Sequence, residues 1–99
     1  MTSDMWVFRD PPNVAVIATR SVVFEQDWIA HVSHDLEDGA WQFRGSQTMQ
    51  TQESEAVVVS LRKIVELDST VKELANLPLG WHAWRAAEGA SWNRAMTDA

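Results

Sequence analysis

Residues 28–44 read WIAHVSHDLEDGAWQFR, and this stretch predicts the centre of the fold. Apolar and polar residues alternate on both sides of Asp35–Gly39, which is the pattern of two half-buried strands. The Asp38-Gly39 pair supplies the positive-φ position that a tight hairpin turn needs. We therefore predict an antiparallel hairpin with Trp41 and Phe43 facing the core.

The segment before the hairpin predicts a central strand. Val14–Thr19 is apolar on both faces and rich in β-branched residues, as in strands covered on both sides. Ser21–Phe24 extends this apolar character past Arg20. Further upstream, Trp6 and Phe8 have strand spacing, and they form either a short edge strand or a segment that folds back over one end of the core.

The segment after the hairpin allows two interpretations. Ala56–Val59 favours a strand because β-branched residues pack well on a pleated sheet. A helix starting at Ala56 would also place several apolar residues on one stripe. We favour a strand ending at Val59, followed by a helix that Ser60 caps and that runs to about Leu67. Gly45–Glu55, which joins this segment to the hairpin, is polar and predicts a loop.

The last third of the chain predicts a short helix, a turn and a strand. Asp68 and Ser69 offer a second cap for a helix that stops before Pro78. Leu77–Gly80 then forms a turn that leads into the strand Trp81–Arg85. Strand alternation places Trp81, Ala83 and Arg85 on one face of that strand, and His82 and Trp84 on the other.

Together these elements predict a small α+β domain. The expected fold is a mostly antiparallel sheet with two short helices packed on one face. A chain of 99 residues has room for one domain. We assign residues 1–13 to an N-terminal lead-in, 14–92 to the α+β domain and 93–99 to a C-terminal tail.

Composition excludes several classes of protein. Eight basic and fourteen acidic residues give a formal charge of −6, which argues against a nucleic-acid-binding protein. There is no cysteine, so disulfides, thiol catalysis and cysteine-containing zinc sites are excluded. No basic n-region with an apolar h-region stands at the start, and no apolar run approaches the roughly 20 residues that span a bilayer. We expect a cytoplasmic protein without a membrane contact.

The residues typical of metal or catalytic sites do not form a recognisable motif. His31 and His34, with Asp35 and Asp38 after them, have ligand-type side chains, but a strand directs the two imidazoles to opposite faces. The carboxylates of the hairpin turn share one solvated environment, which does not separate their pKa values for acid–base catalysis. Nucleophile elbows and glycine-rich phosphate loops are missing from the sequence. We predict no metal, no cofactor and no enzymatic activity.

Tryptophan content and the acidic turn point to a partner-binding surface. Six tryptophans in 99 residues supply core volume, but tryptophan and arginine are also enriched at the centres of protein interfaces. Strand alternation separates Trp81 from Trp84, so one of the two is expected to face away from the core. The candidate partner-binding residues are the three acids of the turn and three residues of the last strand: Asp35, Glu37, Asp38, Trp81, Trp84 and Arg85.

Three segments together resemble a family of small bacterial domains, the immunity-protein-like domains found near polymorphic toxin systems. The family pattern combines a Gly-x-Trp-x-Phe strand, an apolar helix ending in Asp, and a Leu-Pro-x-Gly turn before a strand ending in Arg. The matching segments are Gly39–Phe43, Ile64–Asp68 and Leu77–Arg85, within a resemblance that spans Val14 to Trp92. The chain departs from the pattern at Ser69, where the family usually has proline. The resemblance implies an α+β fold and binding to a toxin partner, and it carries no catalytic residue.

Three hypotheses about function follow. The first is a non-enzymatic binding module of the immunity type, whose acidic charge suits a basic protein partner. The second is a structural or regulatory domain that self-associates through its tryptophan-rich strands. The third is a small enzyme whose site leaves no linear motif.

Overall fold

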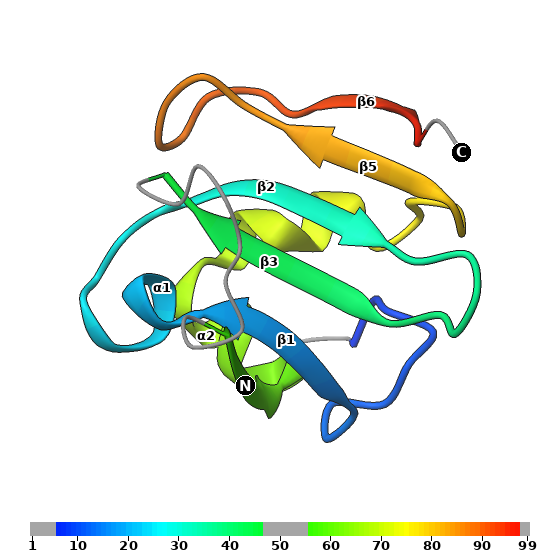
Figure 1. The fold of residues 1–99 in the computed structure, drawn as a ribbon, viewed down its shortest axis with the longest axis horizontal. Helices are drawn as coiled ribbons and strands as arrows, with labels where there is room; N and C mark the ends of the chain where they lie inside the picture. The colour runs from blue at the N-terminus through cyan, green and yellow to red at the C-terminus, as the bar shows by residue number, and fades with distance from the viewer. Residues whose placement is uncertain (1–5, 47–55, 98–99) are drawn as a thin grey trace, which may run out of the picture.

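The fold is a six-stranded sheet with short helices, seen in a computed structural model that describes residues 6–46 and 56–97 (Figure 1). The strands are β1 (Ala15–Thr19), β2 (Ile29–His34), β3 (Trp41–Gly45), β4 (Ala56–Ser60), β5 (Trp81–Trp84) and β6 (Asn93–Met96). The helices among the described residues are α1 (Arg20–Phe24), α2 (Leu61–Leu67) and the 3₁₀ helix η2 (Ser69–Leu74). Their order along the sheet is β4-β1-β3-β2-β5-β6.

The sheet is mostly antiparallel, with one parallel pair. β1 lies parallel to β3, whereas β4, β2, β5 and β6 each run antiparallel to their neighbours. The predicted hairpin is confirmed: β2 and β3 pair across the turn, Val32 lies opposite Phe43, and both Trp41 and Phe43 are buried. Gly39 adopts the expected positive φ of 73°.

The core lies between the sheet and the helices α2 and η2, which cover one of its faces (Figure 1). Ile64 of α2 and Leu74 of η2 are fully buried against the strand residues of that face, such as Val32 and Phe43. Alternate strand residues point to the opposite face of the sheet, which we call the outer face. Its residues include His31, Gln42, Arg44, His82 and Trp84.

Two predicted helix starts are confirmed. The Ser60 hydroxyl accepts a hydrogen bond from the Lys63 backbone N–H at 3.1 Å, at the junction between β4 and α2. The Asp68 carboxylate accepts one from the Thr70 backbone N–H at 3.0 Å and starts η2. Each side chain satisfies an amide that the first helical turn leaves without a backbone partner.

Two elements differ from the sequence prediction. Ser21–Phe24, read as an apolar extension of the first strand, instead belongs to α1, where Val22 alone is buried and Phe24 is exposed. The Ser21 hydroxyl donates to the Asp27 carboxylate at 2.9 Å, which favours this compact turn over continued extension. The expected tail, residues 93–99, includes strand β6, which pairs with β5.

The N-terminal segment folds back onto the core, as one of the two alternatives predicted. Phe8 is buried and meets Trp41 edge-to-face, with ring centroids 5.4 Å apart. The Trp41 indole N–H donates to the Asp10 carboxylate at 2.9 Å. The expected loop Gly45–Glu55 falls mainly on residues 47–55, which lie outside the described residues; Gly45 itself ends β3.

Candidate functional site

The acidic turn between β2 and β3 is held by its own hydrogen bonds. The Asp35 backbone N–H donates to the Ala40 carbonyl at 2.8 Å, and the Gly39 N–H donates to the Asp35 carbonyl at 2.9 Å. The Asp38 carboxylate accepts from the Ala40 N–H at 2.9 Å. Asp35 accepts from the Gln42 side-chain amide at 2.7 Å and is half-buried, whereas Glu37 and Asp38 are exposed.

A second turn lies directly against the acidic turn. The Gly80 N–H donates to the carbonyl of His34 at 2.7 Å, so the segment Pro78–Gly80 is fixed beside the end of β2. Gly80 has a φ of 81°, and a β-carbon there would lie 3.5 Å from the Leu36 side chain. Glycine at position 80 therefore allows the left-handed backbone, whereas a β-carbon there would make only ordinary van der Waals contact with Leu36.

Apolar side chains are exposed where the two turns meet. Leu36 is 69% exposed and Leu79 is 49% exposed, and Met96 lies opposite Trp81 in the β5–β6 pair with 68% exposure. We call this surface the acidic–apolar end; it consists of Leu36, Glu37, Asp38, Leu79, Trp81 and Met96. Within the described part of the chain, the carboxylates of Glu37 and Asp38 form no ion pair.

The structure brings some of the predicted site residues together and separates others. Trp81 lies opposite His34, near the acidic turn, and is half-buried against the core. Trp84 is 40% exposed but sits on the outer face, about 10 Å farther along β5 at the usual strand rise. The more exposed tryptophan of the pair is therefore the one farther from the acidic turn.

Arg85, the sixth predicted partner-binding residue, lies inside the fold. It is 4% exposed, and its guanidinium pairs with the Asp68 carboxylate at 2.6 Å. It also donates to the Ile29 carbonyl at 2.8 Å and to the Thr70 hydroxyl at 3.0 Å, while the Trp92 ring lies 4.2 Å from the guanidinium carbon. These contacts join β5, β2 and the start of η2, so we assign Arg85 a structural role and leave it out of the candidate surface.

On the outer face, a chain of hydrogen bonds crosses three strands. The Arg44 guanidinium lies 3.2 Å from Nδ1 of His31, and Nε2 of His31 lies 3.4 Å from Nδ1 of His82. Arg44 also donates to the Gln42 side-chain oxygen at 2.8 Å, and Gln42 donates to Asp35. Because a guanidinium only donates, neutral His31 must accept at Nδ1 and carry its proton on Nε2, from which it donates to His82.

This arrangement disfavours a charge on His31. Burial, the nearby Arg44 guanidinium and His82 together lower the pKa of His31 from 6.5 to about 4. Below pH 6.5 the unfolded chain therefore binds a proton at this position that the folded chain does not bind until about pH 4. The folded state accordingly loses stability as the pH falls through this window.

We expect His31→Gln to reduce the pH dependence of stability between about pH 6.5 and about pH 4. Over this pH range the wild type should lose about 1 kcal/mol more unfolding free energy than His31→Gln does. The effect is no larger because water screens this half-buried group. Urea unfolding of both proteins at several pH values measures it. If the unfolding free energy of the two proteins changed equally with pH, His31 would not be the source of the pH dependence.

The two histidines of the His31-x-x-His34 pattern point to opposite faces, as predicted. His34 stacks on Trp41 on the core side, with ring centroids 3.9 Å apart, and its Nδ1 lies 2.8 Å from the Leu77 carbonyl. Within residues 6–46 and 56–97, no group of three or more His, Asp or Glu side chains is placed to hold a metal ion. None of the helices in this part of the chain has the length and apolar character required to cross a membrane.

No protein-family model, curated protein or solved structure matches this chain. The sequence indicated the acidic turn, but it did not indicate Leu79 or Met96. The sequence cue that could have indicated Leu79 is its position between Pro78 and Gly80, because such turns usually lie on the surface of a protein.

Proposed function

We propose that this chain is a non-enzymatic binding module of the bacterial immunity type, which neutralises or regulates a basic protein partner in the cytoplasm. The observation that supports this proposal is the acidic–apolar end. There, exposed Leu36 and Leu79 lie beside the carboxylates of Glu37 and Asp38, which have no ionic partner among residues 6–46 and 56–97.

The carboxylates and the leucines contribute differently to binding: the first to the association rate and the second to the affinity. Carboxylates on a protruding turn attract a positively charged partner and accelerate its encounter. Charge at the rim contributes little affinity by itself, because solvent screens it. The leucines supply apolar surface that is removed from water when the partner binds. Such central apolar anchors carry most of the affinity of an interface.

Removing the charge should weaken the partner's association. We expect Glu37→Gln/Asp38→Asn to reduce affinity about tenfold at low salt, chiefly through a slower association rate. The difference from the wild type should shrink as salt is added, because salt screens exposed charges. The partner is captured from the native host, identified by mass spectrometry, purified, and measured against both proteins at several salt concentrations.

A matched control separates the site from the net charge of the chain. Glu66→Gln/Glu73→Gln also removes two exposed carboxylates, but from α2 and η2 instead of the turn. This control should bind the partner as the wild type does, within about twofold. Equal loss in both variants would mean that total charge, and not the acidic–apolar end, attracts the partner.

Self-association through the tryptophan-rich strands is the alternative function. β5 is hydrogen-bonded to β2 on one side and to β6 on the other, so a second copy cannot pair with its backbone. A self-associating chain would have to use the exposed Trp84 ring on the outer face or the free edge of β6. Analytical ultracentrifugation of the purified chain separates the two proposals: the binding module sediments as a monomer.

A further inference from the structure

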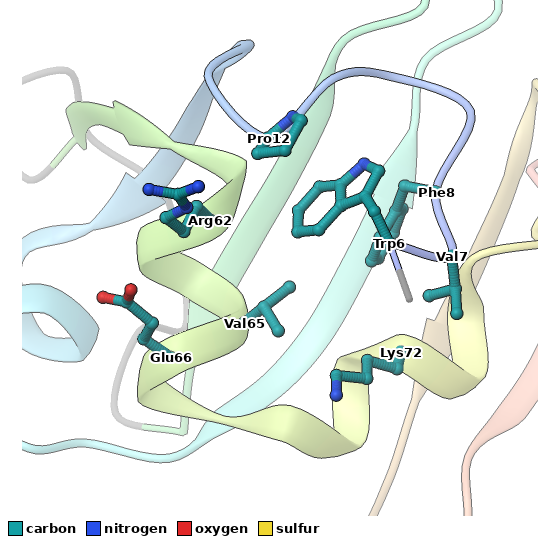
Figure 2. Close-up of a pocket in the computed structure, with 8 residues that line it drawn as sticks. All are labelled: Trp6, Val7, Phe8, Pro12, Arg62, Val65, Glu66 and Lys72. Atoms are coloured by element: carbon teal, nitrogen blue, oxygen red, sulfur yellow. The ribbon is translucent and has the colours of Figure 1, made fainter. Parts of the chain in front are cut away.

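A hollow of about 480 Å³ lies between the N-terminal segment and the turn that follows η2. It is lined by residues of the segments 7–10 and 75–79 and by two sheet residues, His34 and Trp41. Figure 2 shows Val7, which lines the hollow from the N-terminal segment, beside the part of η2 that follows Lys72. Leu79 belongs both to this hollow and to the acidic–apolar end, but neither Glu37 nor Asp38 lines the hollow.

His34 offers one hydrogen-bond acceptor at this hollow. Its Nδ1 lies 2.8 Å from the Leu77 carbonyl oxygen, and its ring stacks on Trp41. Because a carbonyl oxygen only accepts, neutral His34 carries its proton on Nδ1 and leaves Nε2 as an acceptor. Nε2 has no hydrogen-bond partner among the described residues, and it is not one of the buried polar atoms that lack a partner. Nε2 is therefore open to a donor from outside the chain.

The other residues of the hollow favour a ligand that is neutral and mostly apolar. Val7 and Leu79 are 48% and 49% exposed and come from the two different segments, so a ligand between them would remove apolar surface from water. Arg9 and Asp10 bring one charge of each sign, which gives no preference for an anion or a cation. A volume of 480 Å³ falls within the roughly 300–1,000 Å³ of small-molecule pockets.

We infer that this hollow binds a small phenol, with its ring between Val7 and Leu79 and its hydroxyl donating to Nε2 of His34. A phenol combines an apolar ring with one O–H donor and carries no charge at neutral pH. Its hydroxyl is more acidic than that of an aliphatic alcohol, so it is the better donor to an imidazole nitrogen. The inference does not depend on the proposed partner-binding function.

The test compares phenol with fluorobenzene, which has nearly the same size but no O–H. In ¹H–¹⁵N NMR titrations at about pH 8, where an ordinary imidazole is neutral, phenol should bind with a dissociation constant of roughly 5 mM, as expected for so small a ligand. Phenol should shift the Leu79 amide and the Trp41 indole N–H, and the ¹⁵N resonance of His34 Nε2 should move as that atom accepts a hydrogen bond. Fluorobenzene should bind at least about fivefold more weakly, because it lacks this one hydrogen bond.

Three variants test the acceptor and the apolar wall separately. His34→Phe keeps an aromatic ring against Trp41 but removes Nε2, and it should bind phenol about as weakly as the wild type binds fluorobenzene. His82→Phe removes an imidazole from the outer face that does not line the hollow, and it should leave phenol binding unchanged. Val7→Ser should weaken the binding of both probes by about threefold, because it removes apolar surface.

The comparison of phenol with fluorobenzene in the wild type decides the inference even if His34→Phe does not fold. Saturable binding absent at about 30 mM phenol, equal binding of phenol and fluorobenzene, or a His34 Nε2 resonance that phenol does not move would each overturn it. Unchanged phenol binding in a folded His34→Phe variant would overturn it as well.

Discussion

Replacing Arg85 with methionine should lower the free energy of unfolding by about 3–5 kcal/mol, the largest loss of stability that we expect from a single substitution. The guanidinium is buried and pairs with Asp68, so methionine would leave that carboxylate beside the core without its cation. The substitution also removes the bonds to the Ile29 carbonyl and the Thr70 hydroxyl. Since domains of this size are stable by only about 5–15 kcal/mol, much of the stability would be lost.

Urea unfolding followed by tryptophan fluorescence measures this loss, with two comparisons. Arg94→Met makes the same replacement at an exposed arginine of β6 and should change stability by less than about 1 kcal/mol. Arg85→Met/Asp68→Leu removes both charges and should be more stable than Arg85→Met alone, because no unpaired charge remains buried. A loss below about 1 kcal/mol in Arg85→Met would contradict the structural role given to this residue.

Replacing Leu36 with serine should reduce affinity for the protein partner by about thirtyfold or more, the effect of losing a central apolar anchor. The fold should tolerate the change, because Leu36 is mostly exposed and contributes little to the core. The loss should appear in the dissociation rate, whereas removing the charges of the turn acts on the association rate. Calorimetry and surface plasmon resonance with the purified partner measure both quantities.

Phe24→Ser provides the matched control for Leu36→Ser. Phe24 is a similarly exposed apolar residue, at 64%, and it belongs to α1 instead of the acidic–apolar end. Its replacement should leave partner affinity unchanged. If Phe24→Ser weakened binding and Leu36→Ser did not, the binding surface would lie around α1.

Local sequence signals predicted the parts of the fold that depend on neighbouring residues. The Asp38-Gly39 turn fixes the β2–β3 hairpin, and Ser60 and Asp68 fix the starts of α2 and η2 through bonds to amides two or three residues away. Alternation along β5 correctly separated Trp81 from Trp84. Such features follow from side-chain spacing and capping, which are visible in the sequence.

Elements that depend on distant contacts could not be predicted in the same way. β6 has little apolar alternation, and it forms because β5 offers an unpaired edge. The parallel pairing of β1 with β3 joins segments separated by the whole of β2. Arg85 looks like a surface cation in the sequence, and its burial depends on Asp68, which is 17 residues away.

The candidate site also contains residues that neighbouring sequence predicts and residues that only distant contacts bring together. The carboxylates of Asp35, Glu37 and Asp38 are adjacent in sequence, so their common location in one turn was predictable. The proximity of Leu79 and Met96 results from the pairing of β5 with β2 and β6, which the sequence does not show. Of the apolar residues of the acidic–apolar end, Trp81 was therefore a predicted candidate, whereas Leu36, Leu79 and Met96 emerged only from the structure.

Site-specific photo-crosslinking in the native host tests most directly whether the acidic–apolar end binds a protein partner. A photoreactive amino acid is placed at position 36 in one protein and at position 24 in another, two exposed apolar positions on different elements. We predict that position 36 forms a covalent adduct with one basic protein, that added salt reduces this adduct, and that position 24 forms none. An adduct from position 24 alone, or the absence of any adduct at position 36, would contradict the account.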